Sequence, residues 1–313
     1  MSRKVTKADI ELLSCIAEYK FLTVKQLAAF SQRSQQVIRR KLRIFESEYL
    51  IVMKERGFGR GPGRRENIII LSEKGITLLR DKEILSNHGT YITDKTRELI
   101  FINHDLVVNW FFIHLLQIGR ENPRFFTQHL TISSHNLKEG NAEKPLLQER
   151  FSTDQDHEKI NIMIPDGVFT IHDNESEKSL LFFLEVDMGT EILAKTDRTP
   201  GDVRQKIINY RALFHSNHYK RYEKIFNTQL NGFRLLFLNS SFVGMKAICN
   251  LVQEMPPSNF IWVTDQDQMF SHGLSAEIWA RGGRYEKPLE SILGRELAFE
   301  STVLDKIKYP KKV

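Results

Sequence analysis

Three carboxylates in the middle of the chain have the spacing of a metal site. Asp166 follows Pro165 at the end of an apolar run, and Glu185 and Asp187 close the apolar segment SLLFFLEVD. Because side chains alternate along a β-strand, we expect Glu185 and Asp187 on the same face of their strand. An aspartate opposite such a pair provides the oxygen ligands that hard divalent cations prefer. The spacing therefore predicts that Asp166, Glu185 and Asp187 bind Mg²⁺ or Mn²⁺, provided that this acidic site is functional.

Lysines that can complete such a site follow in the sequence. Lys206 lies in a predicted helix, four residues before Tyr210, and Lys195 precedes that helix. Beside a metal that polarises a phosphodiester, a lysine stabilises the negative charge that develops on the phosphate oxygens. A nuclease hypothesis would make Lys206 a catalytic residue together with the three carboxylates.

Structural roles also explain the same carboxylates. Asp166 precedes Gly167, and this pair of residues is common in turns. Glu185 and Asp187 suit the end of a strand that leaves the core and becomes polar. The sequence leaves both interpretations open.

The elements around these residues follow a mixed α/β pattern. Two strands joined by the turn HDNESEK are followed by a capped helix start at TPGD (199–202), with Pro200 as its first residue. Residues 133–159 are polar and are interpreted as a loop with room for one short helix. We predict an α/β domain with a mixed sheet over residues 121–313. The predicted strands cover residues 160–171, 179–187, 233–241 and 259–265, and a helix covers residues 242–255.

Residues 1–90 have a different pattern. Apolar residues at helical spacing predict three helices, which begin at Thr6, at the capping box of Thr23 and at Ser34. The buried face of the third helix is predicted to consist of Val37, Ile38, Leu42 and Phe45. Its other face carries side chains that can contact base edges and phosphates. These are Gln35, Gln36, Arg39, Arg40 and Arg43.

A predicted hairpin and a further helix follow. The segments YLIVMK (49–54) and ENIIIL (66–71) are strand-like, and Ser72 caps a helix within residues 71–80. The loop between the strands, ERGFGRGPGRR, is too rich in glycine for a helix and lacks the G-x-x-x-x-G-K-[ST] spacing of a P-loop. We predict that its arginines bind DNA. They are Arg56, Arg60, Arg64 and Arg65.

Three helices, a hairpin and a closing helix make the pattern of a winged helix-turn-helix, and the run from Tyr49 to Leu79 resembles the wing of bacterial winged-helix regulators. In that arrangement the third helix enters the major groove of double-stranded DNA, and the wing contacts phosphate or the adjacent minor groove. Charge agrees with a polyanion partner: residues 1–97 carry 20 Lys or Arg and 11 Asp or Glu, net +9, whereas residues 98–313 carry 25 and 28, net −3. A winged helix that docks only onto protein is the alternative.

The segment 91–120 is predicted to connect the two domains. An apolar helix is expected there from Thr93 to about Gln117, and because it is apolar nearly all round it suits burial or a homodimer contact. No segment has the ~20 apolar residues of a membrane span, so we expect no membrane partner. The first residues lack the apolar region of a signal peptide, which favours a cytoplasmic protein.

The pattern PD-x(18)-E-x-D, followed by a helix, resembles the PD-(D/E)XK nuclease superfamily. The resemblance implies that Asp166 and Glu185 bind metal. Position 187 departs from it, with Asp where the superfamily has the Lys that positions the attacking water. A negative charge cannot do that work, so either Lys206 or Lys195 takes over the role or activity is lost.

The order of motifs along the chain resembles the replication-relaxation family of plasmid and mobile-element proteins. The resemblance covers about residues 5–265 and rests on NHDLVVN, IPDGVF, FFLEVDMGTE and a Lys-Tyr helix. It implies DNA binding and a role in replication control. We therefore expect a double-stranded-DNA-binding protein with an inactive nuclease-like domain, which Asp at position 187 favours. The alternatives are a Mg²⁺-dependent DNA endonuclease and an acidic sheet that binds a protein partner of a replication or defence system.

Overall fold

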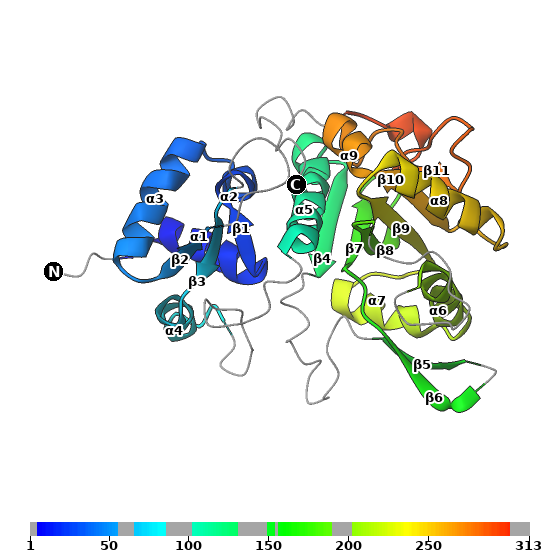
Figure 1. Ribbon diagram of the computed structural model, residues 1–313, viewed down its shortest axis with the longest axis horizontal. Coiled ribbons are helices and arrows are strands. Elements are labelled where there is room, and N and C mark those ends of the chain that lie inside the picture. Colours follow the sequence, from blue (N-terminus) through cyan, green and yellow to red (C-terminus); the bar gives the residue numbers. More distant parts are fainter. Residues whose placement is uncertain are drawn as a thin grey trace. The chain divides into compact units, whose positions relative to one another are not determined.

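The computed structural model describes residues 5–55, 66–85, 102–130, 149–153, 156–189 and 202–300 (Figure 1). The chain divides into two compact units. The amino-terminal unit contains residues 1–113, 131–146 and 310–313, and the carboxyl-terminal unit contains residues 114–130 and 147–309. Helix α5 (Ile102–Glu121) contributes residues to both units.

Capped helices and a small sheet form the amino-terminal unit. The predicted caps are confirmed: Thr6 and Thr23 each form a capping box, and the Ser34 and Ser72 side chains accept hydrogen bonds from the first turns of their helices. Such caps satisfy backbone N–H groups that have no partner inside the helix. The elements are α1 (Lys7–Glu18), β1 (Phe21–Thr23), α2 (Val24–Ser31), α3 (Gln35–Ser47), β2 (Ile51–Lys54), β3 (Ile68–Leu71) and α4 (Glu73–Asp81).

The sheet of this unit has the order β1-β3-β2, and all its strands are antiparallel. The predicted hairpin corresponds to β2 and β3. The first half of α5 packs against the unit through buried polar contacts. The Asn109 amide donates to the backbone oxygens of Tyr19 and Phe21, at 3.3 and 2.9 Å. The Gln26 amide donates to the backbone oxygen of Leu106 at 2.7 Å.

A mixed six-stranded sheet organises the carboxyl-terminal unit, as predicted. Its order is β11-β10-β9-β8-β7-β4; β8, β9 and β10 run parallel, and the remaining neighbours are antiparallel. The strands are β4 (Phe125–Leu130), β7 (Gly167–Asp173), β8 (Lys178–Asp187), β9 (Phe233–Asn239), β10 (Ile261–Asp265) and β11 (Ala280–Arg281), with a separate pair β5 (Glu149–Thr153) and β6 (Asp156–Met163). The helices are α6 (Val203–His215), α7 (Arg221–Phe226), α8 (Phe242–Gln253) and α9 (Gln266–His272), with 3-10 turns at His218–Lys220 and Arg295–Leu297.

One face of this sheet packs against α6, α7 and α8 (Figure 1). Phe183 of β8, Phe237 of β9 and Val263 of β10 belong to the same buried cluster as Tyr210 of α6 and Ile248 of α8. Because side chains alternate along β8, Glu185 shares the face of Phe183. The predicted acidic residue therefore points toward the helix that carries the predicted lysine.

Three details of the predicted elements were wrong. Residues 160–171 do not form one strand, because Pro165 has no N–H to donate and the chain breaks between β6 and β7. Part of the predicted loop 133–159 is strand, since β5 and β6 pair with each other. Helix α6 starts at Val203 rather than Pro200, because Asp202 is the N-cap and its side chain accepts from Arg204 N at 2.8 Å.

One predicted core residue of α3 is less buried than expected, since Val37 is half-buried. The predicted connecting helix is described from Ile102 to Glu121, and its first predicted residues lie outside the described ranges. Within those ranges, none of the helices is both long and apolar enough to cross a lipid bilayer.

Candidate functional site

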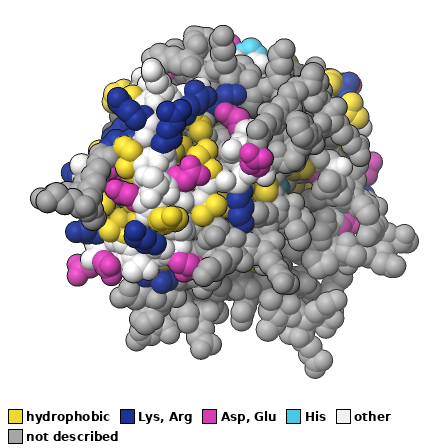
Figure 2. Space-filling view, turned by 60° about the vertical axis from the view of Figure 1, so that its left-hand side comes forward, with side chains coloured by type: hydrophobic (Ala, Val, Ile, Leu, Met, Phe, Trp, Pro, Cys, Tyr) yellow, Lys and Arg dark blue, Asp and Glu magenta, His cyan; other side chains and the backbone are white. Residues whose placement is uncertain are grey.

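The first candidate surface is the exposed face of α3. Ile38, Leu42 and Phe45 are buried, so the helix is fixed to its unit by one face. The opposite face exposes Gln36, Arg39, Arg40 and Arg43, whereas Gln35 is half-buried. In Figure 2, which brings the side of α3 forward, Lys and Arg side chains gather in one area of the surface.

Side-chain contacts order part of this face. An Arg39 guanidinium nitrogen donates to the Gln35 side-chain oxygen at 3.0 Å, one helical turn earlier. The Ser34 hydroxyl caps the helix start at Val37 N. The predicted wing arginines Arg56, Arg60, Arg64 and Arg65 lie outside the described residues, so their DNA contact stays a prediction.

The second candidate site is a buried cluster between β8 and α6. Glu185 is 2% exposed. The Tyr210 hydroxyl donates to one Glu185 carboxylate oxygen at 2.6 Å, and the Lys206 ammonium contacts the other at 2.8 Å. Because Lys206 and Tyr210 are four residues apart on α6, they project from the same side of the helix. The structure thus brings the predicted lysine onto the predicted glutamate.

Asp166 lies beside this cluster. Its backbone N–H donates to Leu184 O, and its carboxylate accepts from Val186 N at 2.7 Å, so Asp166 is fixed to β8 on both sides of Glu185. Burial raises the pKa of Glu185 to about 7, Lys206 opposes this rise, and the negative charge of Asp166 adds to it. Burial and the neighbouring Glu185 raise the pKa of Tyr210, so the phenol keeps its proton and acts as a hydrogen-bond donor.

Asp187 has different partners. One of its carboxylate oxygens accepts from Gly189 N at 2.8 Å, and the other accepts from the Asn239 amide at 2.7 Å. It therefore joins the carboxyl ends of β8 and β9. Across the described ranges, the structure holds no group of three Asp, Glu, His or Cys side chains arranged to bind one metal ion. Metal binding by Asp166, Glu185 and Asp187 stays a prediction, and Lys195 lies outside the described residues.

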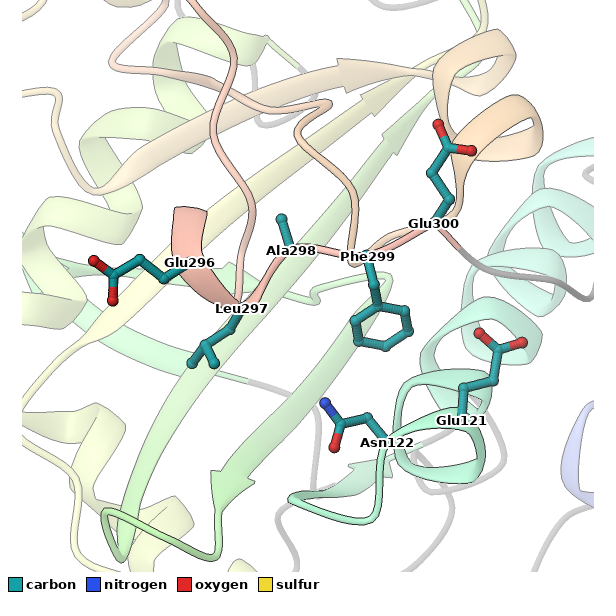
Figure 3. Close-up of a pocket in the computed structure, with 7 residues that line it drawn as sticks. All are labelled: Glu121, Asn122, Glu296, Leu297, Ala298, Phe299 and Glu300. Atoms are coloured by element: carbon teal, nitrogen blue, oxygen red, sulfur yellow. The ribbon is translucent and has the colours of Figure 1, made fainter.

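A surface pocket of about 590 Å³ lies elsewhere in the carboxyl-terminal unit (Figure 3). In Figure 3 the Phe299 ring lies between its own chain segment and Asn122. The Glu300 carboxylate pairs with the His272 ring at 2.7 Å. The lining residues are Glu121, Asn122, Glu296, Leu297, Ala298, Phe299 and Glu300. None of the predicted site residues that the structure describes lines this pocket.

Two residues of the second site were not assigned a role from the sequence. Tyr210 was noted for its spacing from Lys206 and as part of the Lys-Tyr helix, and the i, i+4 spacing is the signal that it shares the site. Asn239 gave no signal, because it lies 52 residues after Asp187 and meets it only through the pairing of β8 with β9.

No curated protein matches the chain. The model of the replication-relaxation family matches residues 13–228, which is well over half of the 313 residues and includes α3, Asp166, Glu185 and Lys206. The chain therefore belongs to the replication-relaxation family.

Proposed function

We propose that this protein binds double-stranded DNA in the replication control of a mobile element, and that α3 is its DNA-contacting helix. Family membership connects the chain with the replication of mobile elements. The DNA contact is supported by one observation: Arg39, Arg40 and Arg43 are exposed on the face of α3 that is opposite its buried residues.

A helix with this division between its faces suits the major groove. Its apolar face is held by the unit, so its arginines can contact phosphates and base edges without loss of packing. The α2–α3 pair and the β2–β3 hairpin support a winged helix-turn-helix, in which α3 is the recognition helix. The net charge of +9 over residues 1–97 adds long-range attraction to DNA.

The salt dependence of binding tests this proposal. Duplex binding by the full chain is measured by fluorescence anisotropy over a salt series, for the wild type and for Arg39→Ala/Arg40→Ala. If both arginines contact phosphate, the slope of log affinity against log salt becomes less steep by about 2. The matched control is Lys287→Ala/Arg295→Ala, which removes two exposed charges from the carboxyl-terminal unit. An unchanged slope in the α3 variant would show that Arg39 and Arg40 do not contact DNA phosphates and would contradict the proposal.

The carboxyl-terminal unit supports a second candidate, a metal-dependent DNA nuclease. The observation that favours it is the contact of Lys206 with Glu185 beside Asp166. A lysine at this point can stabilise charge on a phosphate, although position 187 is occupied by Asp. The lysine of a PD-(D/E)XK-like site would then come from α6.

The residues present fit a hard cation in part. Mg²⁺ is commonly held by one or two carboxylates together with substrate phosphate, and Asp166 and Glu185 would supply two. When bound, the cation would act as a Lewis acid toward a phosphoryl oxygen. Tyr210 and Lys206 fix both Glu185 oxygens, so they orient the carboxylate. Asp187 is held by Gly189 and Asn239 and is not needed as a ligand.

A cleavage assay decides between the two candidates. The full chain is incubated with supercoiled plasmid, linear duplex and single-stranded DNA, with Mg²⁺, Mn²⁺ or EDTA. A nuclease cuts with metal, and Asp166→Ala/Glu185→Ala and Lys206→Met both lose this activity. DNA binding without cutting under every condition leaves the carboxyl-terminal unit as a non-catalytic part of a DNA-binding protein.

A further inference from the structure

Aromatic rings and a lysine lie together at the start of α8. Phe242 is 50% exposed and Val243 is 78% exposed, and they are consecutive in the sequence. The Lys246 ammonium lies 4.8 Å from the centre of the Phe242 ring and 5.3 Å from the centre of the Tyr285 ring. Phe242, Val243, Lys246 and Tyr285 are called the aromatic–lysine strip below.

The strip is held by a rigid support. The Asn239 side-chain oxygen accepts from Ser241 N at 2.9 Å, and the Ser241 hydroxyl caps α8 by accepting from Gly244 N at 3.1 Å. Gly244 packs so closely on the Asn239 side chain that a Cβ would overlap it. Asn239 is itself held by Asp187. The exposed apolar residues thus stand on a fixed helix start, where ordering them on binding costs little entropy.

The strip lies at the end of the sheet where ligands commonly bind. Helix α8 starts directly after the carboxyl end of β9, and β9 is the parallel neighbour of β8, which carries Glu185 near its own carboxyl end. In open α/β sheets, ligands bind outside the carboxyl ends of parallel strands. Both α6 and α8 pack on the same face of the sheet, so the strip and the Glu185 cluster belong to the same layer.

We propose that the aromatic–lysine strip binds unpaired nucleotides of single-stranded DNA. The exposed Phe242 ring offers a surface on which a base stacks, and Tyr285 offers a second ring. The ammonium of Lys246, which is within 5.3 Å of both ring centres, pairs with the backbone phosphate. A protein partner would suit a wider apolar patch without a cation at its centre. This binding goes beyond the duplex contact proposed for α3, because a duplex hides the faces of its bases.

The test uses the full chain and a fluorescent oligothymidylate of about 16 nucleotides, which has no paired bases and spans a single-strand site. Phe242→Ala is expected to weaken its binding roughly 5- to 150-fold, the range supplied by stacking of one base. Phe242→Tyr keeps an aromatic ring and is expected to bind nearly as the wild type does. The matched control is Phe126→Ala, which removes a phenylalanine of similar exposure, 54%, from β4.

Comparison with duplex binding separates this proposal from that for α3. Phe242→Ala is expected to leave duplex affinity unchanged, whereas Arg39→Ala/Arg40→Ala weakens it. The strip proposal is overturned if the wild type does not bind oligothymidylate, if Phe242→Ala binds it as well as Phe126→Ala does, or if Phe242→Tyr is as weak as Phe242→Ala. Each of these results leaves the α3 proposal to its own salt-dependence test.

Discussion

The α3 face and the Glu185 cluster place their charges in opposite surroundings. The arginines of α3 are exposed, so their field extends into solvent and is screened by salt. The Glu185 carboxylate is buried, the Lys206 side chain is 16% exposed, and the two groups lie 2.8 Å apart. Exposed charges of one sign suit a distant polyanion, whereas a buried matched pair acts only on a group that enters the site. The same chain thus exposes positive charges in one unit and pairs opposite charges within the other.

The largest expected effect concerns the buried pair. Lys206→Met leaves Glu185 buried without its cation and should lower the free energy of unfolding by about 3–5 kcal/mol, since breaking a buried pair strands a charge. Urea unfolding of the full chain at about pH 9 measures this loss, because Glu185, whose pKa is raised to about 7, is ionised there in the wild type. Glu185→Gln/Lys206→Met should recover part of it. As a control, Arg295→Ala breaks an exposed pair with Glu277 and should cost less than about 1 kcal/mol. If Lys206→Met and Arg295→Ala cause similar losses of stability, the buried pair contributes no more than an exposed pair.

The second prediction tests how burial of a histidine in the carboxyl-terminal unit makes stability depend on pH. Burial lowers the pKa of His114 to about 4. The histidine of the unfolded chain binds a proton below about pH 6.5, whereas the folded one does so only below about pH 4. The stability that the neutral, buried His114 contributes is therefore fully present above about pH 6.5 and is lost as the pH falls toward about 4. Between pH 7 and pH 5 the loss should be about 2 kcal/mol. Urea unfolding of His114→Gln at both values should lack this part of the loss, and an identical pH dependence would contradict it.

The third effect tests whether the amino-terminal unit, despite its exposed charge, is held by neutral contacts. Asn109→Ala removes two hydrogen bonds and leaves the buried oxygens of Tyr19 and Phe21 without this donor. We expect the free energy of unfolding to fall by about 1–3 kcal/mol, and this change should depend little on salt. Thermal unfolding at low and high salt measures this loss of stability. The comparison is Lys25→Ala, which removes the ion-pair partner of Glu66 and should cause a loss that depends on salt. A strongly salt-dependent loss in Asn109→Ala would contradict this assignment.

The smallest effect concerns the start of α3, the helix that we propose contacts DNA. Ser34→Ala removes the cap of α3 and should cost about 1 kcal/mol, because a backbone N–H loses its acceptor. Ser34→Asp keeps an acceptor and should restore stability. Circular dichroism melts of the two variants provide the measurement. If alanine and aspartate melt at the same temperature, the cap does not stabilise α3.

Local patterns explain which elements could be predicted. The caps at Thr6, Thr23 and Ser34 were predicted correctly because a capping side chain and the backbone N–H that it accepts are within three residues. The three-residue strand β1 was missed because it is too short for alternation and forms only by pairing with β3. The end of β6 was misplaced because the apolar run continued across Pro165.

For the site, the sequence by itself determined the residue types and the i, i+4 relation of Lys206 and Tyr210, because helical geometry makes neighbours of such residues. It also determined that Arg39, Arg40 and Arg43 share one face of α3. Only the tertiary structure decided that Lys206 and Tyr210 both contact Glu185, while Asp187 joins β8 to β9 through Asn239. Those contacts link residues 21 to 52 positions apart, and the packing of α6 on the sheet and the register of parallel strands, which no local pattern encodes, bring them together.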